Sequence, residues 1–465
     1  MTNSSAWGGI QMECASMIEE MVARSRAAQR AIENWTQQQA DAAVRAIAKA
    51  VYDNAEPLAR MAVDETRMGV YEHKVAKNRG KARIIWMSLK NRQSVGVLRR
   101  DPVTGVTEVA KPMGVVAAVT PCTNPIVTPM CNAMFALKCR NSIIIAPHPR
   151  AKACARAVVD LCNKALAELG APEHLIQAID EPTVELTNLL MKAADVVIAT
   201  GGMGMVRAAY SSGKPSFGVG AGNVQCIVDR GMDPADVAAK VVAGRIFDNG
   251  IICSAEQTLI AHEDDFAALR AAFEAEGTVL VTRDDEKRRL REAIFPGGAV
   301  NKRLVGQPVS AIADAADIRI PEGTRMLLVM ADGPGRADIL SHEKMCPVAA
   351  GYIYKTFEEA VDIAALNLEE EGRGHSVAIH SNDRAHLEYA AERLPVSRLL
   401  VNQICATMNG GSFNNGFTPT TTLGCGTWGN NSISENLDFT HLMNITRIGE
   451  YRPDNPVPSD EEIWA

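Results

Sequence analysis

Residues 115–125 read VVAAVTPCTNP. The first five form an unbroken apolar run rich in valine, which predicts a buried strand, and the two prolines predict a turn after it. Further apolar runs lie at 143–146, 175–179, 196–199 and 226–228, with helical stretches at 151–169 and 183–193 between them. Strands that alternate with helices predict a mostly parallel, doubly wound α/β sheet. Such sheets bind ligands at the carboxyl ends of their strands, which is where residues 120–125 lie.

The rest of the chain predicts a second α/β lobe and a projecting hairpin. Between about residues 234 and 406, expected helices at 266–276 and 358–367 alternate with expected strands at 326–330, 349–353 and 399–401. Residues 99–111 predict the hairpin, because Pro102 and Gly105 interrupt two strand-like segments. Beyond residue 409 the chain is rich in Gly, Asn and Thr, and strand-like alternation returns at 445–448.

Composition excludes several classes of protein. Of the 465 residues 47% are hydrophobic and 22% charged, which is typical of a folded globular chain. The net charge of -7 argues against a nucleic-acid partner, since phosphate binding requires clustered Lys and Arg. No long apolar run or secretory signal is visible, so we expect no membrane association. The eleven cysteines lack CxxC pairs and zinc-type Cys/His spacing, which predicts free thiols, no metal site and a cytoplasmic location.

Cys253 is the first candidate for chemistry. It lies in NGIICSAEQ, residues 249–257, where a glycine and an apolar turn favour a thiol beside a loop. Such a thiol is a nucleophile once a helix N-terminus, a cation or a base lowers its pKa. The competing interpretation is a structural cysteine, because free cysteines are among the most buried residues.

Asn124 and two glycine-rich turns are candidates at strand ends. The Asn124 amide can donate to an oxyanion during attack on a carbonyl, or it can form an Asx turn between the two prolines. The turns at 201–204 and 218–223 can bring backbone N–H groups close to a pyrophosphate. The first, GGMG, lacks the full GxGxxG pattern, so a turn that only packs is equally compatible with it.

Two further side chains have both a functional and a neutral interpretation. Glu343, in EKMCPV at 343–348, can accept hydrogen bonds from ribose hydroxyls, although most glutamates are only solvated. His375, in GRGHS at 372–376, is flanked by glycines that would leave its ring accessible as an acid or base. A loop histidine without a role is the alternative.

Five motifs, in order along the chain, resemble the aldehyde dehydrogenase superfamily. They are TPCTNP at 120–125, ATGG at 199–202, GVGAGN at 218–223, NGIICSAEQ at 249–257 and EKMCPV at 343–348. Residues 410–437 resemble the C-terminal region of its CoA-acylating branch, especially the subfamilies that act on succinate semialdehyde and sulfoacetaldehyde. The resemblance spans nearly the whole chain. It implies an α/β fold of two doubly wound lobes, one Rossmann-like, and a small β arm.

The resemblance also implies a division of the chain and roles for single residues. The implied parts are a dinucleotide-binding domain (1–98 and 112–232), a catalytic domain (233–408), an oligomerisation arm (99–111 and 432–450), a segment near the active site (409–431) and a tail (451–465). Cys253 becomes the nucleophile, Asn124 the oxyanion donor and His375 a residue near the thiol. The residues implied in cofactor binding are Thr120, Pro121, His148, Arg150, Gly201, Gly202, Gly204, Val219, Gly220 and Glu343.

One departure from the hydrolytic relatives bears on the reaction. Where they resemble ELGG, with a glutamate that activates water, this chain has Val219, Gly220 and Ala221. A thioacyl group on Cys253 should then persist until a thiol accepts it, which implies coenzyme A as a second substrate. The implied activity is a reversible CoA-acylating aldehyde dehydrogenation. A hydrolytic aldehyde dehydrogenase is the nearer alternative, and a cysteine acyltransferase or an assembly subunit are more distant ones.

Substrate, cofactor and partner expectations follow from the same resemblance. Residues 145–150 offer His148 and Arg150 but no acid to repel a 2′-phosphate, so NADP is slightly favoured over NAD. The two subfamilies imply a short aldehyde with an anionic tail. Arg373 is the candidate clamp, because a guanidinium can grip a carboxylate or sulfonate with two hydrogen bonds, and a surface arginine is the alternative. An arm of this kind pairs subunits, so we expect a homodimer or homotetramer.

Overall fold

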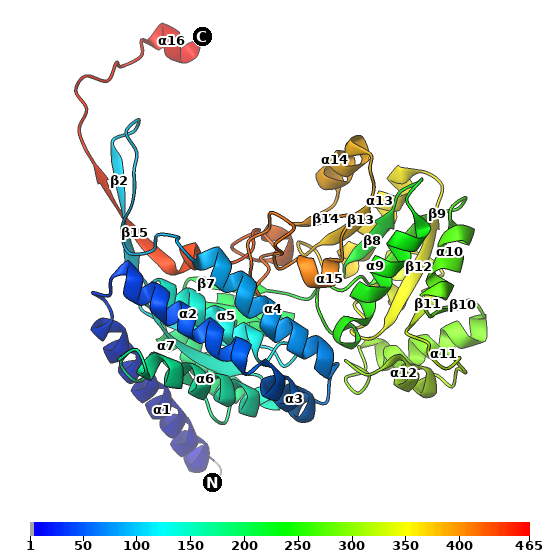
Figure 1. The fold of residues 1–465 in the computed structure, drawn as a ribbon, viewed down its shortest axis with the longest axis horizontal. Helices are drawn as coiled ribbons and strands as arrows, with labels where there is room; N and C mark the ends of the chain where they lie inside the picture. Colours follow the sequence, from blue (N-terminus) through cyan, green and yellow to red (C-terminus); the bar gives the residue numbers. More distant parts are fainter. Residues whose placement is uncertain (1–3) are drawn as a thin grey trace.

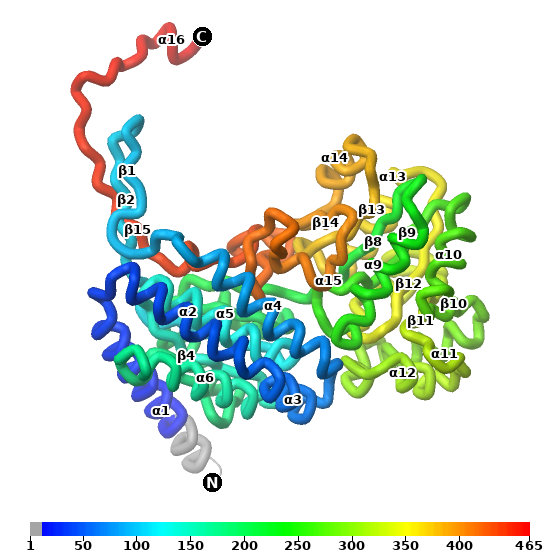
Figure 2. Tube along the Cα trace, viewed as in Figure 1, coloured from blue at the N-terminus to red at the C-terminus, as the bar shows by residue number. Residues whose placement is uncertain are grey.

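The computed structural model describes residues 4–465, with side chains from Met12 onward. Two α/β lobes lie side by side, and a thin arm projects from the N-terminal lobe (Figures 1 and 2). This arrangement confirms the predicted fold class. Within the described residues, no helix combines the length and the apolar character needed to cross a bilayer.

The N-terminal lobe contains a five-stranded sheet whose neighbouring strands all run parallel. In spatial order the strands are β5 (Ile176–Ala178), β4 (Ser142–Pro147), β3 (Val115–Thr120), β6 (Val196–Thr200) and β7 (Ser216–Val219). The helices are α1 (Ser4–Ala31), α2 (Gln37–Asp53), α3 (Ala55–Thr66), α4 (Tyr71–Leu89), α5 (Val127–Lys138), α6 (Lys152–Ala167), α7 (Val184–Ala193) and α8 (Met203–Tyr210).

Strand β3 has a core on both of its faces. Val116 and Ala118 pack in one core with residues of α2, α4, α5 and α6. Val115 and Ala117 pack in another with residues of α1 and α7. Successive side chains of a strand point to opposite faces, so a strand covered by helices on both sides is apolar throughout. This is why the unbroken run at 115–119 could be recognised from sequence.

The C-terminal lobe contains a seven-stranded sheet, again parallel at every pairing. In spatial order its strands are β10 (Thr278–Val281), β11 (Met326–Met330), β12 (Val348–Tyr354), β9 (Thr258–His262), β8 (Gln225–Val228), β13 (Val377–His380) and β14 (Leu399–Val401). Its helices are α9 (Pro234–Ile246), α10 (Phe266–Ala275), α11 (Asp284–Ile294), α12 (Val309–Ala315), α13 (Phe357–Glu370), α14 (Arg384–Arg393) and α15 (Cys405–Met408).

Strand β8 differs from the expected division of the chain. The sequence assigned residues up to 232 to the dinucleotide-binding lobe, but β8 pairs with β9 and β13 in the seven-stranded sheet. The chain therefore crosses between the lobes between the end of β7 at Val219 and the start of β8 at Gln225, and not at residue 232. An apolar run of four residues does not encode its pairing partners, because these depend on contacts far along the chain.

The arm is a three-stranded antiparallel sheet. Its strands are β1 (Gly96–Arg100), β2 (Val106–Pro112) and β15 (Met443–Gly449), with β2 in the middle. Strands β1 and β2 form the hairpin expected at 99–111. The C-terminal tail continues past the arm and ends in the short helix α16 (Asp460–Trp464), away from both lobes (Figure 1).

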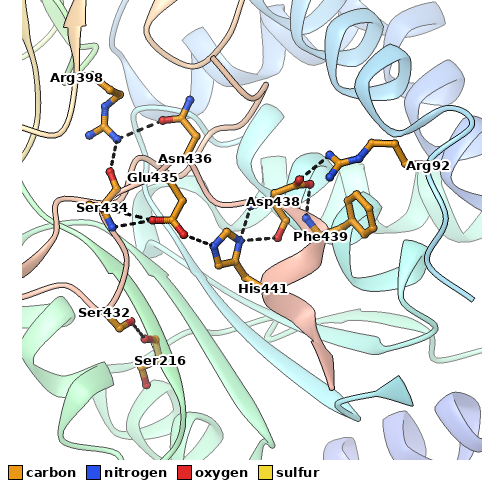
Figure 3. Close-up of polar contacts among 10 residues, drawn as sticks. All are labelled: Arg92, Ser216, Arg398, Ser432, Ser434, Glu435, Asn436, Asp438, Phe439 and His441. Carbon is orange, nitrogen blue, oxygen red and sulfur yellow. Dashed lines mark hydrogen bonds and ion pairs between the residues drawn. The ribbon is translucent and has the colours of Figure 1, made fainter. Parts of the chain in front are cut away.

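Residues 432–441 run between the lobes and bind to both of them (Figure 3). From the C-terminal lobe, the buried Arg398 guanidinium donates to Asn436 Oδ1 at 3.2 Å. Toward the N-terminal lobe, Ser432 Oγ donates to the carbonyl oxygen of Ser216 at 2.6 Å. This segment therefore bridges the two sheets before the chain enters the arm.

The end of the same segment is held by charge and by an aromatic ring. Arg92 donates to Asp438 Oδ2 at 2.6 Å, and its guanidinium lies 4.4 Å from the centroid of the Phe439 ring (Figure 3). His441 Nε2 lies 3.0 Å from Glu435 Oε1. These contacts fix the direction in which β15 leaves the body.

Candidate active site

Two cavities meet at Cys253. One, of about 440 Å³, is lined by helix α4 and by residues 406–421, and we call it the α4 cavity. The other, of about 330 Å³, lies over the carboxyl ends of β3, β4 and β6 and includes the turn at 201–202, and we call it the glycine-turn cavity. Cys253, Asn124, Thr421 and Leu423 line both. A reactive group at Cys253 is therefore open to two ligand spaces at once.

The backbone before Cys253 is held in a tight turn. After α9, Asp248 and Asn249 adopt the left-handed region with φ of 53° and 55°, which is uncommon for residues other than glycine. The buried Arg245 guanidinium donates to the carbonyl oxygens of Gly250 at 2.8 Å and Glu256 at 3.0 Å, on either side of Cys253. These bonds stabilise the turn that presents the thiol.

Gly222, in the GVGAGN motif, packs directly against the turn that contains Cys253. A Cβ atom on Gly222 would fall on the carbonyl oxygen of Cys253. Only glycine permits this approach of two backbones, so this position explains part of the glycine content of the motif.

The environment of the Cys253 thiol disfavours its anion in the ligand-free chain. Burial raises its pKa to about 12, and the ionised form of Glu343 adds to the rise, while Arg398 and the Cys253 N–H oppose it. The thiol is therefore protonated near neutral pH until a ligand or a base changes its surroundings.

The Asn124 amide is oriented by a lysine. Lys77 Nζ lies 2.9 Å from Asn124 Oδ1, so the amide oxygen accepts the hydrogen bond. The amide nitrogen has no hydrogen-bond partner within the described residues, although Asn124 lines both cavities beside Cys253. The Asx-turn interpretation leaves that free donor unexplained, whereas an oxyanion role requires it.

The glycine-turn cavity brings together most of the residues expected to bind a dinucleotide. Eight of the ten line it, namely Thr120, Pro121, His148, Gly201, Gly202, Val219, Gly220 and Glu343. A Cβ atom on Gly201 or Gly202 would meet nothing within 4 Å, and no side chain caps the N-terminus of α8 that follows. Open backbone at a helix N-terminus suits a pyrophosphate, so the residues present fit a dinucleotide.

Gly204 and Arg150 do not line this cavity. Gly204 is already inside α8, and the exposed Arg150 donates through Nη2 to the carbonyl oxygen of Thr66 at 2.7 Å. Direct contact of these two residues with a ligand in the cavity is therefore not supported by the geometry.

Glu343 is a buried carboxyl group on the wall of the glycine-turn cavity. Burial, reinforced by the neighbouring Glu371, raises its pKa well above the usual range. It is the only carboxyl residue among the described residues that line this cavity, and none of those around the α4 cavity carries one. A neutral carboxyl group is a hydrogen-bonding group and not a base for water.

His375 contradicts the expectation of an accessible ring. Its side chain is completely buried, neither ring nitrogen has a hydrogen-bond partner, and it lines neither cavity. Burial, with a smaller contribution from Arg398, lowers its pKa to about 3. The flanking glycines do not expose the ring, because a Cβ on Gly372 would meet Asn223 and one on Gly374 would fall on the Cys425 carbonyl oxygen.

Arg373 is also not where the sequence suggested. It is exposed and lines neither cavity, so the geometry does not support it as the clamp for a substrate anion. The cations of the α4 cavity are instead Lys77, Lys81 and Arg83. Sequence reasoning missed them, although the segment KVAKNRGKAR at 74–83 is dense in basic residues and a helix places Lys77 and Lys81 on one face.

Comparison with known proteins gives a consistent result along the whole chain. Residues 2–418 match the Aldehyde dehydrogenase family. The chain is 51% identical over 448 residues to "Succinate-semialdehyde dehydrogenase (acetylating)" of Clostridium kluyveri, covering 96% of this chain and 99% of that protein. It is 40% identical to "Sulfoacetaldehyde dehydrogenase" of an Acholeplasma species, covering 97% and 94% of the two chains.

Solved structures are similar as well. An acetylating aldehyde dehydrogenase from Geobacillus thermoglucosidasius matches with a TM-score of 0.92 at 36% identity, covering 97% of this chain and 99% of that one. A propionaldehyde dehydrogenase from Rhodopseudomonas palustris, solved with bound propionyl-CoA, matches with a TM-score of 0.84 at 26% identity over 93% of this chain and 94% of that one.

The raised pKa of the thiol gives a direct test of its environment. We expect alkylation of Cys253 by iodoacetamide, in the ligand-free chain, to accelerate about tenfold per pH unit from pH 7 to pH 10, because only the thiolate reacts. Mass spectrometry of the peptide that contains Cys253 measures the rate. A plateau between pH 7 and pH 8 would mean that the thiolate already forms there and would contradict the buried, protonated state.

Proposed function

The chain belongs to the aldehyde dehydrogenase family, in its CoA-acylating branch, and we propose that its substrate is a short aldehyde with an anionic tail. The product is the acyl-CoA, and the reverse reaction is equally permitted. The observation that carries this proposal is the composition of the two cavities at Cys253. Lys77, Lys81 and Arg83 line the α4 cavity without any carboxyl residue, and Glu343, whose pKa is raised by burial, is the one carboxyl residue among the described residues of the glycine-turn cavity.

In the proposed reaction the Cys253 thiolate attacks the aldehyde carbon and forms a thiohemiacetal. Asn124 Nδ2 and the Cys253 N–H are the donors available to its oxyanion. A dinucleotide bound in the glycine-turn cavity supplies a hydride acceptor. The chain then carries an acyl group as a thioester on Cys253, and attack by the CoA thiol transfers the acyl group and frees the cysteine.

Water is a poor competitor for this thioester because the site lacks a base to activate it. The segment 219–221 is Val-Gly-Ala, without the glutamate of the hydrolytic relatives, and burial followed by the charge of Glu371 raises the pKa of Glu343, which favours its protonated form. General-base catalysis typically contributes about 10²–10⁴-fold to a rate. Its absence favours transfer to a thiol, because a few per cent of a free thiol is already present as the reactive thiolate near pH 7, whereas water is not ionised to any useful extent.

For the dinucleotide we propose NADP over NAD. His148 lies in residues 145–150, which contain no acidic residue, and it lines the glycine-turn cavity, where Glu343 is the one carboxyl residue among the described lining residues. Its pKa is lowered first by burial and then by the charges of Arg150 and Lys302, so the local field is positive. A positive field and the lack of an acid both favour a 2′-phosphate.

For the anionic tail of the substrate we propose Lys81 and Arg83 in place of Arg373. Lys81 Nζ donates to the carbonyl oxygens of Gly410 at 2.8 Å and Thr420 at 3.2 Å, which leaves one N–H free at the cavity wall. The side chain of Arg83, in the middle of α4, makes no hydrogen bond or ion pair with any described residue. The two cations therefore have donors available for a carboxylate or a sulfonate.

We also propose that the arm pairs subunits into a homodimer or homotetramer. The arm and the tail expose Val103, Tyr451, Val457 and Trp464, whose exposed fractions are 79%, 90%, 91% and 82%. Apolar side chains on a narrow projection have no core of their own to enter, and a second copy of the chain can cover them.

The dependence on CoA tests the function itself. With aldehyde and NADP+, we expect one rapid turnover per chain without CoA, followed by a rate about 100-fold lower than the rate with CoA. Absorbance of the reduced cofactor at 340 nm follows both phases. Equal steady-state rates with and without CoA, with free acid as product, would favour the hydrolytic alternative.

The substrate proposal is tested by removing the two cations. Lys81→Met and Arg83→Ala should each raise KM for succinate semialdehyde about tenfold or more, because a charge-assisted hydrogen bond is lost. Butyraldehyde, which has the same chain length but no carboxylate, should show less than a threefold change. Arg373→Ala is the matched control and should leave both KM values unchanged. A rise in KM for succinate semialdehyde but not for butyraldehyde in Arg373→Ala would instead support Arg373 as the residue that binds the substrate anion.

The pairing of subunits is tested by light scattering. We expect a mass of two or four times 50.0 kDa for the full chain at micromolar concentration. Deletion of residues 450–465 should weaken the assembly if the tail contacts the second copy. A monomer of the full chain would contradict the proposal.

A further inference from the structure

We propose that Lys77 is a positioning residue that orients the Asn124 amide toward the reacting oxyanion. The inference rests on the proposed function, since it concerns the donor that stabilises the thiohemiacetal on Cys253. Lys77 itself does not need to touch the substrate for this role.

The contacts of the Lys77 ammonium account for its three protons. Nζ lies 2.7 Å from Asp248 Oδ2, 2.9 Å from Asn124 Oδ1 and 3.5 Å from the carbonyl oxygen of Thr123. An ammonium group has donors and no acceptor, so the atom of Asn124 that faces it must be the amide oxygen. The amide cannot flip by 180° without placing its own N–H groups against a cation.

The fixed oxygen determines where the N–H groups of Asn124 lie. The NH₂ group is on the opposite side of the amide from Lys77, and Asn124 lines both cavities together with Cys253. No described residue accepts a hydrogen bond from it. The hydrogen bond from Lys77 to Asn124 Oδ1 therefore keeps the two N–H donors of Asn124 unpaired beside the thiol. An oxyanion forms at this place when the thiol attacks a carbonyl.

Asp248 in turn fixes the ammonium. Its carboxylate is completely buried, accepts from Lys74 Nζ at 3.0 Å and accepts from the Val70 N–H at 2.8 Å through its other oxygen. These partners, led by Lys77 and Lys74, lower its pKa against the opposing effect of burial, so it remains charged. The Lys77 side chain is only 9% exposed and cannot easily leave this position.

The same contacts join the two halves of the site. Lys77 is on α4 and Asn124 follows β3, both in the N-terminal lobe, whereas Asp248 lies five residues before Cys253 in the turn after α9. The ammonium thus fixes the position of the Asn124 amide relative to the turn that contains Asp248 and Cys253. It also withdraws electron density from the amide oxygen, which makes the N–H groups stronger donors.

Two other roles for Lys77 predict different behaviour. A lysine that binds the anionic tail of the substrate would affect only charged aldehydes. A lysine that lowers the pKa of Cys253 would affect every reaction of the thiol, including alkylation. A lysine that acts through Asn124 affects the attack on any carbonyl and loses its influence when Asn124 is removed.

The experiment is a double-mutant cycle with Lys77→Met, Asn124→Ala and the double variant. The rate of the first-turnover burst of reduced cofactor is measured with saturating butyraldehyde, which has no charge. We expect Asn124→Ala to lower the burst rate about 10²-fold or more and Lys77→Met to lower it at least about tenfold. The double variant should match Asn124→Ala within about threefold.

Lys74→Met is the matched control, because Lys74 binds the same carboxylate without touching Asn124. Its burst rate should fall clearly less than that of Lys77→Met, because Lys77 and the Val70 N–H still pair Asp248 and the contact between Lys77 and Asn124 remains. Alkylation of Cys253 by iodoacetamide, which forms no oxyanion, should be unchanged in Lys77→Met. Thermal unfolding of each variant reports whether it is folded. If Lys77→Met does not fold, Lys77→Ala is used instead, and ethylammonium is added to replace the missing ammonium group. The added ethylammonium should restore the burst rate only in a chain that retains Asn124.

The outcomes separate the inference from the function on which it rests. Effects of Lys77→Met and Asn124→Ala that multiply, equal losses in Lys74→Met and Lys77→Met, or slower alkylation in Lys77→Met would each overturn the role of Lys77. An Asn124→Ala variant with an unchanged burst would instead overturn the oxyanion role of Asn124, whatever Lys77 does.

Discussion

The buried carboxylate of Asp248 is the contact on which the site depends. It belongs to the turn that presents Cys253, yet its partners Lys74, Lys77 and the Val70 N–H all belong to the N-terminal lobe. A buried charge is costly unless it is fully paired, so the two lobes can approach in one register only. The left-handed backbone at Asp248 is tolerated because these contacts hold it. Both cavities and the orientation of Asn124 follow from this arrangement.

Burial has opposite consequences for the two halves of the proposed reaction. It raises the pKa of the Cys253 thiol and therefore delays formation of the nucleophile. It also raises the pKa of Glu343, the one carboxyl residue among the described residues that line the two cavities, and so favours the form that cannot accept a proton from water. A site of this kind suits acyl transfer to a thiol, because the acyl group survives long enough to be handed on. The cations of the α4 cavity add attraction for an anionic aldehyde without supplying a base.

The sequence predicted features that depend on local pattern and missed those that depend on distant contacts. The buried run at 115–119 was recognisable because both faces of β3 are covered. The pairing of β8 with β13 and the hydrogen bond between Lys77 and Asn124 both join residues far apart in the chain. No local pattern in the sequence encodes such contacts. His375 was misread because glycines beside it were taken to give exposure, whereas they permit close packing against Asn223 and Cys425. The need for glycine at position 222 in GVGAGN is explained only by the structure, in which Gly222 packs against the backbone of Cys253.

The central claim is that a thioester forms on Cys253 and waits for a thiol. The most direct measurement is mass spectrometry of the chain after one turnover of succinate semialdehyde with NADP+ and no CoA, quenched with acid and mapped to peptides. The account predicts one succinyl group, on the peptide that contains Cys253, that persists over minutes and disappears as succinyl-CoA when CoA is added. Reduced cofactor accompanied by free succinate and no acylated peptide, or an acyl group on another cysteine, would contradict it.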